Sequence, residues 1–198
     1  MRIPGLGGEV FSRAGGTPVT MQVSEVFTAM QTGALDATEF VSPYNDLAAG
    51  YHTVADYYYY PGWHEPGSTL ETIFNKSAFE ALPSDLQAIL RAGAEVMNQL
   101  LMDELTAKNN EALRVLVEDH NVELRKLPDD VLVELKRLSN DVVSELAQTD
   151  EVTARIYESY KSFQEGVFCG FVLVKVIKIH TSLIMVLHVV GIKLGCKR

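Results

Sequence analysis

The chain has 198 residues, of which 47% are hydrophobic and 22% are charged, and its formal net charge is −9 at pH 7. This composition is typical of a folded globular protein with one sizeable core, and it argues against general disorder. Because the acidic body of the chain carries no basic patch, the sequence also argues against a nucleic-acid partner.

Residues 1 to about 75 alternate short β-favouring runs with stretches of helix length, which indicates an α/β domain. Strands are predicted in MRIPGL, PVTMQV and LDATEFV. Helices are predicted in GEVFSRAG and in SEVFTAMQTGA, the second with Ser24 as its N-cap. Units of this kind form parallel sheets whose ligand-binding loops follow the carboxyl ends of the strands.

The segment DYYYYPGWHEPG predicts one or two strands around a loop with two Pro-Gly turns. From Ser77 to His120, and again after Pro128, apolar residues recur at helical spacing. We expect long amphipathic helices there, packed on the α/β part with their Leu, Val and Ala stripes in the core.

The C-terminal segment from Phe168 differs from the rest, because it is apolar and β-branched and all its charges are basic. Lysines interrupt every window of the roughly 20 apolar residues that a membrane helix needs. It fits a membrane-surface segment or a shifted reading frame. Both cysteines, Cys169 and Cys196, lie here, which excludes a disulfide scaffold in the main body. At the other end, MRIPGLGG lacks the apolar run of a signal peptide.

Three places carry side chains suited to binding or catalysis. Arg2 lies in the first predicted strand, where a guanidinium can form a bidentate pair with a carboxylate or serve only as a solvated surface residue. Glu39 ends the third strand, where it can hold a cation or serve only as a turn residue. His64 and Glu65 suit acid–base chemistry, but neighbouring side chains of an extended segment point to opposite faces, which argues against a dyad. The absence of HExxH, CxxC and P-loop motifs favours a binding protein over an enzyme.

The segments RIPGLGGEVFSRAGGTPV, EVFTAMQTGALDATEFVSPYNDLAAGYHTVADYYYYPGWHEPG and NKSAFEALPSDLQAIL follow one another in a specific order. Together they resemble the second lobe of DctP-type solute-binding proteins of tripartite ATP-independent periplasmic (TRAP) transporters, in the subgroup that binds 2-oxo acids and related monocarboxylates. The resemblance covers residues 1–166 and leaves 167–198 as an atypical tail. It implies an α/β lobe of the type II periplasmic-binding-protein kind, with a parallel or mixed sheet, flanking helices and long C-terminal helices, and with the first lobe missing.

The resemblance also implies roles for four residues. By position, Arg2 matches the arginine that grips the ligand carboxylate, and Glu39 matches the acidic residue beside a bound Na⁺ or Ca²⁺. Phe40 stands where the family has Trp and would offer the cation its backbone carbonyl, whereas any contact through an indole N–H is lost. Glu65 matches a second acidic residue at the metal.

The function that the resemblance implies is a periplasmic component that binds a small carboxylate between two lobes and delivers it to a TRAP membrane permease. A homodimer through the long helix is a further expectation. Two alternatives stay open: a small-acid enzyme that uses Glu39 and Glu65 as an acid–base pair, and a truncated, non-functional fragment. Since a cleft needs both walls, we expect weak or no ligand binding by residues 1–198 alone.

Overall fold

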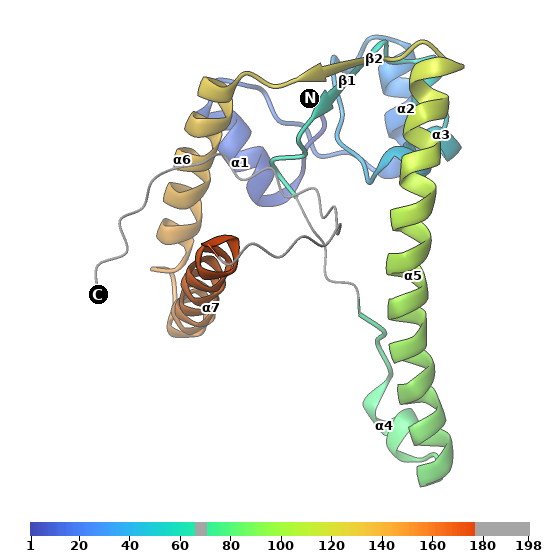
Figure 1. Cartoon of the computed structure of the whole chain (residues 1–198), viewed down its shortest axis with the longest axis vertical. Coiled ribbons are helices and arrows are strands. Elements are labelled where there is room, and N and C mark those ends of the chain that lie inside the picture. The colour runs from blue at the N-terminus through green and yellow to red at the C-terminus, as the bar shows by residue number, and fades with distance from the viewer. Residues whose placement is uncertain (66–70, 177–198) are drawn as a thin grey trace. The chain divides into compact units, whose positions relative to one another are not determined.

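The computed structural model describes residues 1–65 and 71–176, with side chains up to Val167, and the chain divides into two compact units, Met1–Asp129 and Asp130–Arg198. The elements of the first unit are α1 (Gly5–Arg13), α2 (Val23–Gln31), α3 (Pro43–Ala48), the 3₁₀ helix η1 (Tyr51–Thr53), β1 (Tyr57–Tyr60), α4 (Lys76–Glu80), α5 (Ser84–Glu118) and β2 (Glu123–Lys126) (Figure 1). They are followed by α6 (Asp129–Leu146) and α7 (Glu151–Val176).

The three strands predicted near the N-terminus are present only as single parallel bridges around Arg2. Arg2 pairs with Val19 on one side and with Thr38 on the other, so the first segment lies between the other two. Its backbone N–H donates to the carbonyl of Ala37 at 2.9 Å. The predicted alternation of extended segments and helices is confirmed, but the predicted strand lengths are wrong. Pro4 ends the first segment because it has no N–H to donate, and α1 begins at the next residue.

A small apolar core holds these segments together, and α2 supplies half of its fully buried residues. Helix α2 begins at Val23, so Ser24 lies inside the helix and is not the N-cap that the sequence predicts. The aromatic ring of Phe40 packs against the same core. Its buried members are Val26, Ala29, Leu35 and Tyr51.

The tyrosine run forms β1, as predicted, and pairs in parallel with β2. Tyr57 lies opposite Glu123, and Tyr60 lies opposite Lys126. Parallel neighbours need a long crossover, which α4 and α5 provide here (Figure 1). Strand β2 is not among the predicted elements, because three of its four residues are charged and it carries no run of β-favouring residues.

Helix α5 confirms the predicted long helix, since it contains 35 residues. Its C-terminal part packs as expected: Ala112 and Leu116 are buried, and the backbone N–H of Tyr44 in α3 donates to Asn109 Oδ1 at 3.0 Å. The N-terminal two thirds extend beyond α3 (Figure 1), and the prediction that their apolar stripe packs on the α/β part is wrong. We call the following exposed residues the α5 apolar face: Leu86, Ile89, Val96, Met97 and Leu100.

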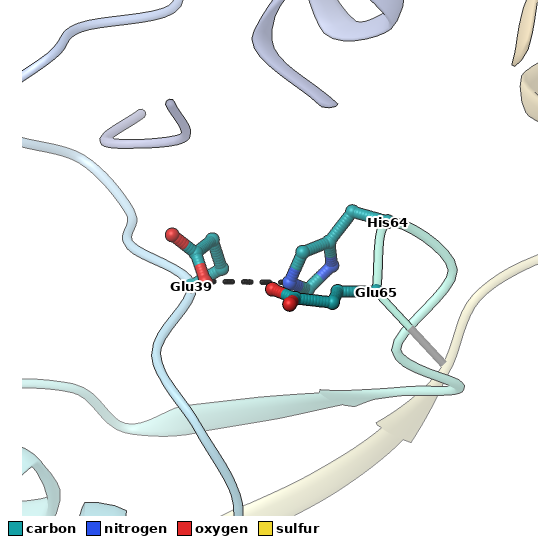
Figure 2. A group of neighbouring side chains, drawn as sticks. All are labelled: Glu39, His64 and Glu65. Atoms are coloured by element: carbon teal, nitrogen blue, oxygen red, sulfur yellow. Dashed lines mark ion pairs between the residues drawn. The ribbon is translucent and has the colours of Figure 1, made fainter. Parts of the chain in front are cut away.

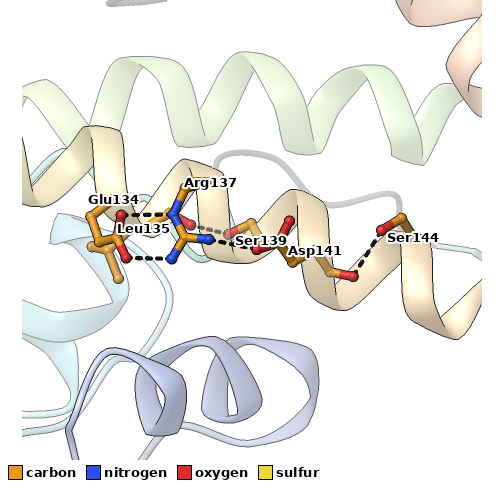
Figure 3. A network of polar contacts seen from close by, with 6 residues as sticks. All are labelled: Glu134, Leu135, Arg137, Ser139, Asp141 and Ser144. Atoms are coloured by element: carbon orange, nitrogen blue, oxygen red, sulfur yellow. Dashed lines mark hydrogen bonds and ion pairs between the residues drawn. The ribbon is translucent and has the colours of Figure 1, made fainter.

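Helix α6 shows the amphipathic pattern that the sequence predicts. Arg137 on its exposed face donates to Glu134 Oε1 at 2.6 Å and to Asp141 Oδ2 at 2.8 Å (Figure 3). Exposed pairs of this kind are screened by solvent and add little to stability. The residues Leu135, Leu138 and Val142 form the buried stripe of the same helix.

Helix α7 runs through residue 167, where the atypical tail is predicted to begin, and continues to Val176. The remainder of that tail, residues 177–198, lies outside the described residues. Among the helices of the described part of the chain, none is long and apolar enough to cross a membrane.

Candidate functional site

Arg2 and Glu39 are brought together by the bridges at the centre of the N-terminal region. The backbone N–H of Glu39 donates to the carbonyl of Arg2 at 3.2 Å, which places the two residues on neighbouring segments. Their side chains form an ion pair in which Arg2 Nη1 lies 2.5 Å from Glu39 Oε1. Both side chains are largely buried, with 12% and 9% of their surface exposed. Arg2 Nε is buried too, and it has no hydrogen-bond partner among the described residues.

The loop after β1 adds His64 and Glu65 to this pair. His64 Nε2 lies 3.3 Å from Glu39 Oε2. One ligand atom from each of Glu39, His64 and Glu65 lies within 4.8 Å of the others, and Figure 2 shows the three side chains converging. The prediction that the neighbouring His64 and Glu65 diverge is therefore wrong, because the chain bends at His64 and is not extended there.

The glycines of the GLGG segment allow α1 to pack closely against this site. A Cβ at Gly8 would lie 2.5 Å from the backbone carbonyl oxygen of Ile3, closer than real Cβ atoms come. A Cβ at Gly7 would lie 3.4 Å from the Cβ of His64. These glycines lie inside α1, so their role here is close packing against Ile3 and His64.

Phe40 is held by the core and not by the cluster. Its ring meets the ring of Tyr51 edge to face, with 5.1 Å between the ring centroids. The side chain therefore anchors the segment that carries Glu39. A contribution of Phe40 to a bound ion would come from its backbone carbonyl, as the resemblance implies.

The chemistry of the cluster suits two ligands of opposite charge. The buried N–H of Arg2 can donate to an anion, for which a carboxylate has the matching planar geometry. The carboxylates of Glu39 and Glu65 are hard oxygen donors, which fit Na⁺ or Ca²⁺. His64 adds a nitrogen donor of a kind that these two ions do not prefer.

A second polar pair, absent from the predicted site, ties together the segments that carry the cluster. Asp46 in α3 is buried, and its Oδ2 accepts a 2.5 Å hydrogen bond from the hydroxyl of Tyr58 in β1. Its Oδ1 accepts a hydrogen bond from the backbone N–H of Val41 at 3.3 Å. Burial raises the pKa of Asp46, and burial together with the bond to Asp46 raises the pKa of Tyr58. Asp46 follows Glu39 closely in sequence and Tyr58 precedes His64, so the pair fixes both arms of the site.

Replacing Asp46 by Asn is expected to remove a pH-dependent loss of stability. Because the pKa of Asp46 is raised above its usual 3.8, the folded state keeps a proton that the unfolded state has released. The contribution of Asp46 to the free energy of unfolding therefore falls as pH rises from about 3.8 through the raised pKa, and is then constant. Denaturant unfolding at a series of pH values measures this. Asp36→Asn, at an exposed aspartate, is the control.

For Asp46→Asn, the wild-type free energy of unfolding minus that of the variant should decrease as pH rises through this window. A difference that grows with pH would show that the pair is stabilised chiefly by ionised Asp46.

Comparisons with known proteins point to one family of binding proteins. Residues 1–150 match the model of the bacterial extracellular solute-binding proteins of family 7, also called DctP. A monocarboxylate 2-oxoacid-binding periplasmic protein of Nostoc sp. is 36% identical over 168 residues, which is 85% of this chain and 46% of the relative.

Two solved TRAP solute-binding proteins are similar in structure. One, from Pseudoalteromonas atlantica T6c with bound sodium and pyruvate, has a TM-score of 0.78 and 36% identity over 85% of this chain and 51% of that one. The other, from Bordetella bronchiseptica RB50, is a mixed-occupancy dimer with a calcium- and picolinate-bound site and an apo site. Its TM-score is 0.81 and its identity 31%, over 88% of this chain and 52% of that one. The chain thus spans about half the length of the relatives it matches.

Proposed function

Because this chain belongs to the DctP family of bacterial extracellular solute-binding proteins, we propose that it forms one lobe of a TRAP transport component that binds a small carboxylate with a metal ion. Its fold is that of a type II periplasmic-binding-protein lobe, as the family resemblance implies. The proposed ligands are 2-oxo acids and related monocarboxylates, which would be held between two lobes in the periplasm and passed to a membrane permease.

The observation that carries this proposal is the buried guanidinium of Arg2 beside an acidic cluster. Arg2 Nη1 is paired with Glu39, whereas its buried Nε has no partner among the described residues. A buried N–H without a partner is costly, and a ligand carboxylate would satisfy it. Glu39, Glu65 and the backbone carbonyl of Phe40 would hold Na⁺ or Ca²⁺ next to that carboxylate. The cation would offset the charge of the ligand and of the two glutamates.

The proposal is tested on a lobe-completed protein, which we define as this chain joined to the first lobe of the Nostoc relative. Titration calorimetry with pyruvate, in buffer that contains Na⁺ or Ca²⁺, should show saturable binding of one ligand per chain. A folded lobe-completed protein that gives no binding heat with pyruvate or other 2-oxo acids would contradict the proposal.

The enzyme alternative, with Glu39 and Glu65 as an acid–base pair, is separated by following the ligand after it binds. If the protein binds its ligand without reacting with it, pyruvate should be recovered unchanged from the lobe-completed protein after long incubation. Conversion of pyruvate or a 2-hydroxy acid, lost on replacing either glutamate by Gln, would favour the enzyme.

We also propose that two copies pair through the α5 apolar face. Four of its residues, Leu86, Ile89, Val96 and Leu100, are spaced by three, seven and four positions and so lie on one side of the helix, as in helices that pack side by side. Sedimentation at several protein concentrations should show a dimer for the wild type. Met97→Glu with Leu100→Glu should give a monomer, because each variant would place a charge in the interface.

The matched control for the α5 apolar face is Asn98→Glu, which adds a charge at an exposed polar position of the same helix. A wild-type chain that stays monomeric at every concentration, or a dimer that survives both glutamate substitutions, would refute pairing through this face.

A further inference from the structure

The backbone carbonyls of Glu39 and Phe40 differ in their hydrogen bonding. The carbonyl of Glu39 accepts a hydrogen bond from the Thr38 hydroxyl at 2.9 Å, so it already has a partner. Among the described residues, none donates to the carbonyl of Phe40. Carbonyl oxygens are hard ligands of the kind that Na⁺ and Ca²⁺ take. The bonding of this segment therefore favours Phe40 over Glu39 as the residue that offers its carbonyl to an ion.

The direction of the Phe40 carbonyl is set by the peptide unit that it shares with Val41. This peptide is trans, and the C=O and N–H groups of a trans peptide lie in one plane and point in opposite directions. Holding the N–H of Val41 therefore fixes the direction of the Phe40 carbonyl as well. The side chain of Val41 is 62% exposed, so its packing does not hold the peptide.

Asp46 in α3 supplies the hydrogen bond that holds this peptide. Its Oδ1 accepts from the backbone N–H of Val41 at 3.3 Å, and its Oδ2 accepts from the Tyr58 hydroxyl. Asp46 is only 8% exposed, and α3 is itself bonded to α5 through Asn109. A buried carboxylate that is bonded at both oxygens cannot turn easily, so it defines where the Val41 N–H points.

The Phe40 residue is thus held by two separate contacts. Its ring packs edge to face against Tyr51 in the core, and the peptide that follows it is bonded to Asp46. Loss of the bond to Asp46 would leave the ring of Phe40 in place but would free the peptide to rotate. The carbonyl oxygen would then move, whereas the side chain would not.

We propose that Asp46 is a positioning residue: it holds the peptide between Phe40 and Val41 so that the Phe40 carbonyl is presented to the cation of the cluster. Groups that orient the ligands of a metal ion, without touching the ion, contribute strongly to its affinity. This role rests on the proposed function, in which the carbonyl of Phe40 is a ligand of Na⁺ or Ca²⁺. Asp46 itself remains outside the coordination of the ion.

The first test measures Ca²⁺ binding to the 198-residue chain by titration calorimetry. Asp46→Ala removes the acceptor of the Val41 N–H and should weaken Ca²⁺ binding roughly 10- to 100-fold. Asp46→Asn keeps an oxygen acceptor at the same place, so its Ca²⁺ affinity should stay within about threefold of the wild type. The control Asp36→Ala, at an exposed aspartate, should leave the affinity unchanged.

A further variant separates positioning from a general loss of stability. Tyr58→Phe removes the hydroxyl that is bonded to Asp46 Oδ2 but leaves Asp46 Oδ1 free to accept from Val41. It should lower the free energy of unfolding, since a buried carboxylate oxygen loses its donor, and keep the Ca²⁺ affinity within about threefold of the wild type. Equal losses of Ca²⁺ affinity in Tyr58→Phe and Asp46→Ala would overturn the proposal.

A spectroscopic readout uses the wild-type chain, so it does not depend on whether a variant folds. With ¹³C at the carbonyl of Phe40, the NMR signal of this carbonyl should shift when Ca²⁺ is added. The Val41 amide hydrogen should exchange slowly with solvent, because it is bonded to Asp46. A carbonyl signal that does not move at saturating Ca²⁺, or a Val41 amide that exchanges as fast as in an unfolded chain, would contradict the proposal.

The outcomes also separate this role from the proposed function. If the wild-type chain binds Ca²⁺ and a folded Asp46→Ala chain binds it equally well, the cation site stands and the positioning role falls. If the wild-type chain binds no Ca²⁺, the metal site of the proposed function falls, and the positioning role falls with it. If Ca²⁺ binding requires Asp46 but the lobe-completed protein binds no 2-oxo acid, the positioning role stands and the transport function falls.

Discussion

Replacing Arg2 by Ala is expected to weaken pyruvate binding by the lobe-completed protein between about 30-fold and a few thousand-fold. Removing one partner of a buried charged pair costs roughly 2–5 kcal/mol, and each 1.4 kcal/mol is about tenfold in affinity. The guanidinium of Arg2 is the buried cation of the site, and Ala at this position also leaves Glu39 without its 2.5 Å ion pair. Titration calorimetry with pyruvate measures the loss.

Two further variants show whether the effect comes from the guanidinium itself. Arg2→Lys keeps the charge but not the planar fork of donors, so it should recover only part of the affinity. Arg114→Ala removes an exposed arginine of α5 and should leave the affinity unchanged. Pyruvate affinity within about twofold of wild type in Arg2→Ala would show that another group binds the carboxylate.

Replacing Gly8 by Ala is expected to lower the free energy of unfolding by about 1–3 kcal/mol. A methyl group at this position would lie 2.5 Å from the backbone carbonyl oxygen of Ile3. The first extended segment cannot yield easily, because Arg2 and Ile3 are hydrogen-bonded to the two neighbouring segments. Overpacking of this kind typically costs 1–3 kcal/mol. Denaturant unfolding followed by circular dichroism measures the change.

The control for Gly8→Ala is a glycine-to-alanine substitution at a position where the added methyl group meets no other atom. Gly166 lies inside α7, and a Cβ there would meet nothing within 4 Å. Gly166→Ala should therefore raise helix stability, by up to about 1 kcal/mol. Equal stability of the Gly8→Ala chain and the wild type would mean that α1 can move away from Ile3, and that the site is less rigidly built than the contacts indicate.

The sequence predicts the extended segments that carry Arg2 and Glu39, but not that these segments are neighbours. Arg2 lies in the first extended segment and Glu39 at the end of the third, and the structure pairs these two in parallel. The pattern of β-favouring runs and helices does not tell which segments lie side by side. The roles of Arg2, Glu39, Phe40 and Glu65 as ligand and metal contacts come from the family resemblance and stay predictions.

The contribution of His64 could not be predicted in the same way. It depends on how the loop after β1 folds back over α1, and an extended-strand rule assigns His64 and Glu65 to opposite faces. The Asp46–Tyr58 pair is also set by tertiary contact, since nothing local marks Asp46 as buried. The available signal was the clustering of a histidine, an acid and a tryptophan within one Pro-Gly loop.

Helix α5 shows another limit of periodicity. Its apolar residues at helical spacing correctly predict a helix, but spacing does not tell whether this chain or another surface covers them. In the structure the α5 apolar face is exposed, and only the end of the helix near Ala112 and Leu116 enters the core. Strand β2 could be assigned only from its pairing with β1, since its charged residues give no local signal.

The central claim is that one cluster holds a carboxylate and a cation together, and its most direct test is the pyruvate affinity of the lobe-completed protein as a function of Ca²⁺ concentration. Ligands that bind side by side must raise each other's affinity by the same factor. We predict that pyruvate affinity rises with Ca²⁺ and reaches a plateau in the wild type, and that Glu39→Gln abolishes this dependence. A wild-type affinity that does not change from Ca²⁺-free buffer to saturating Ca²⁺ would contradict the claim.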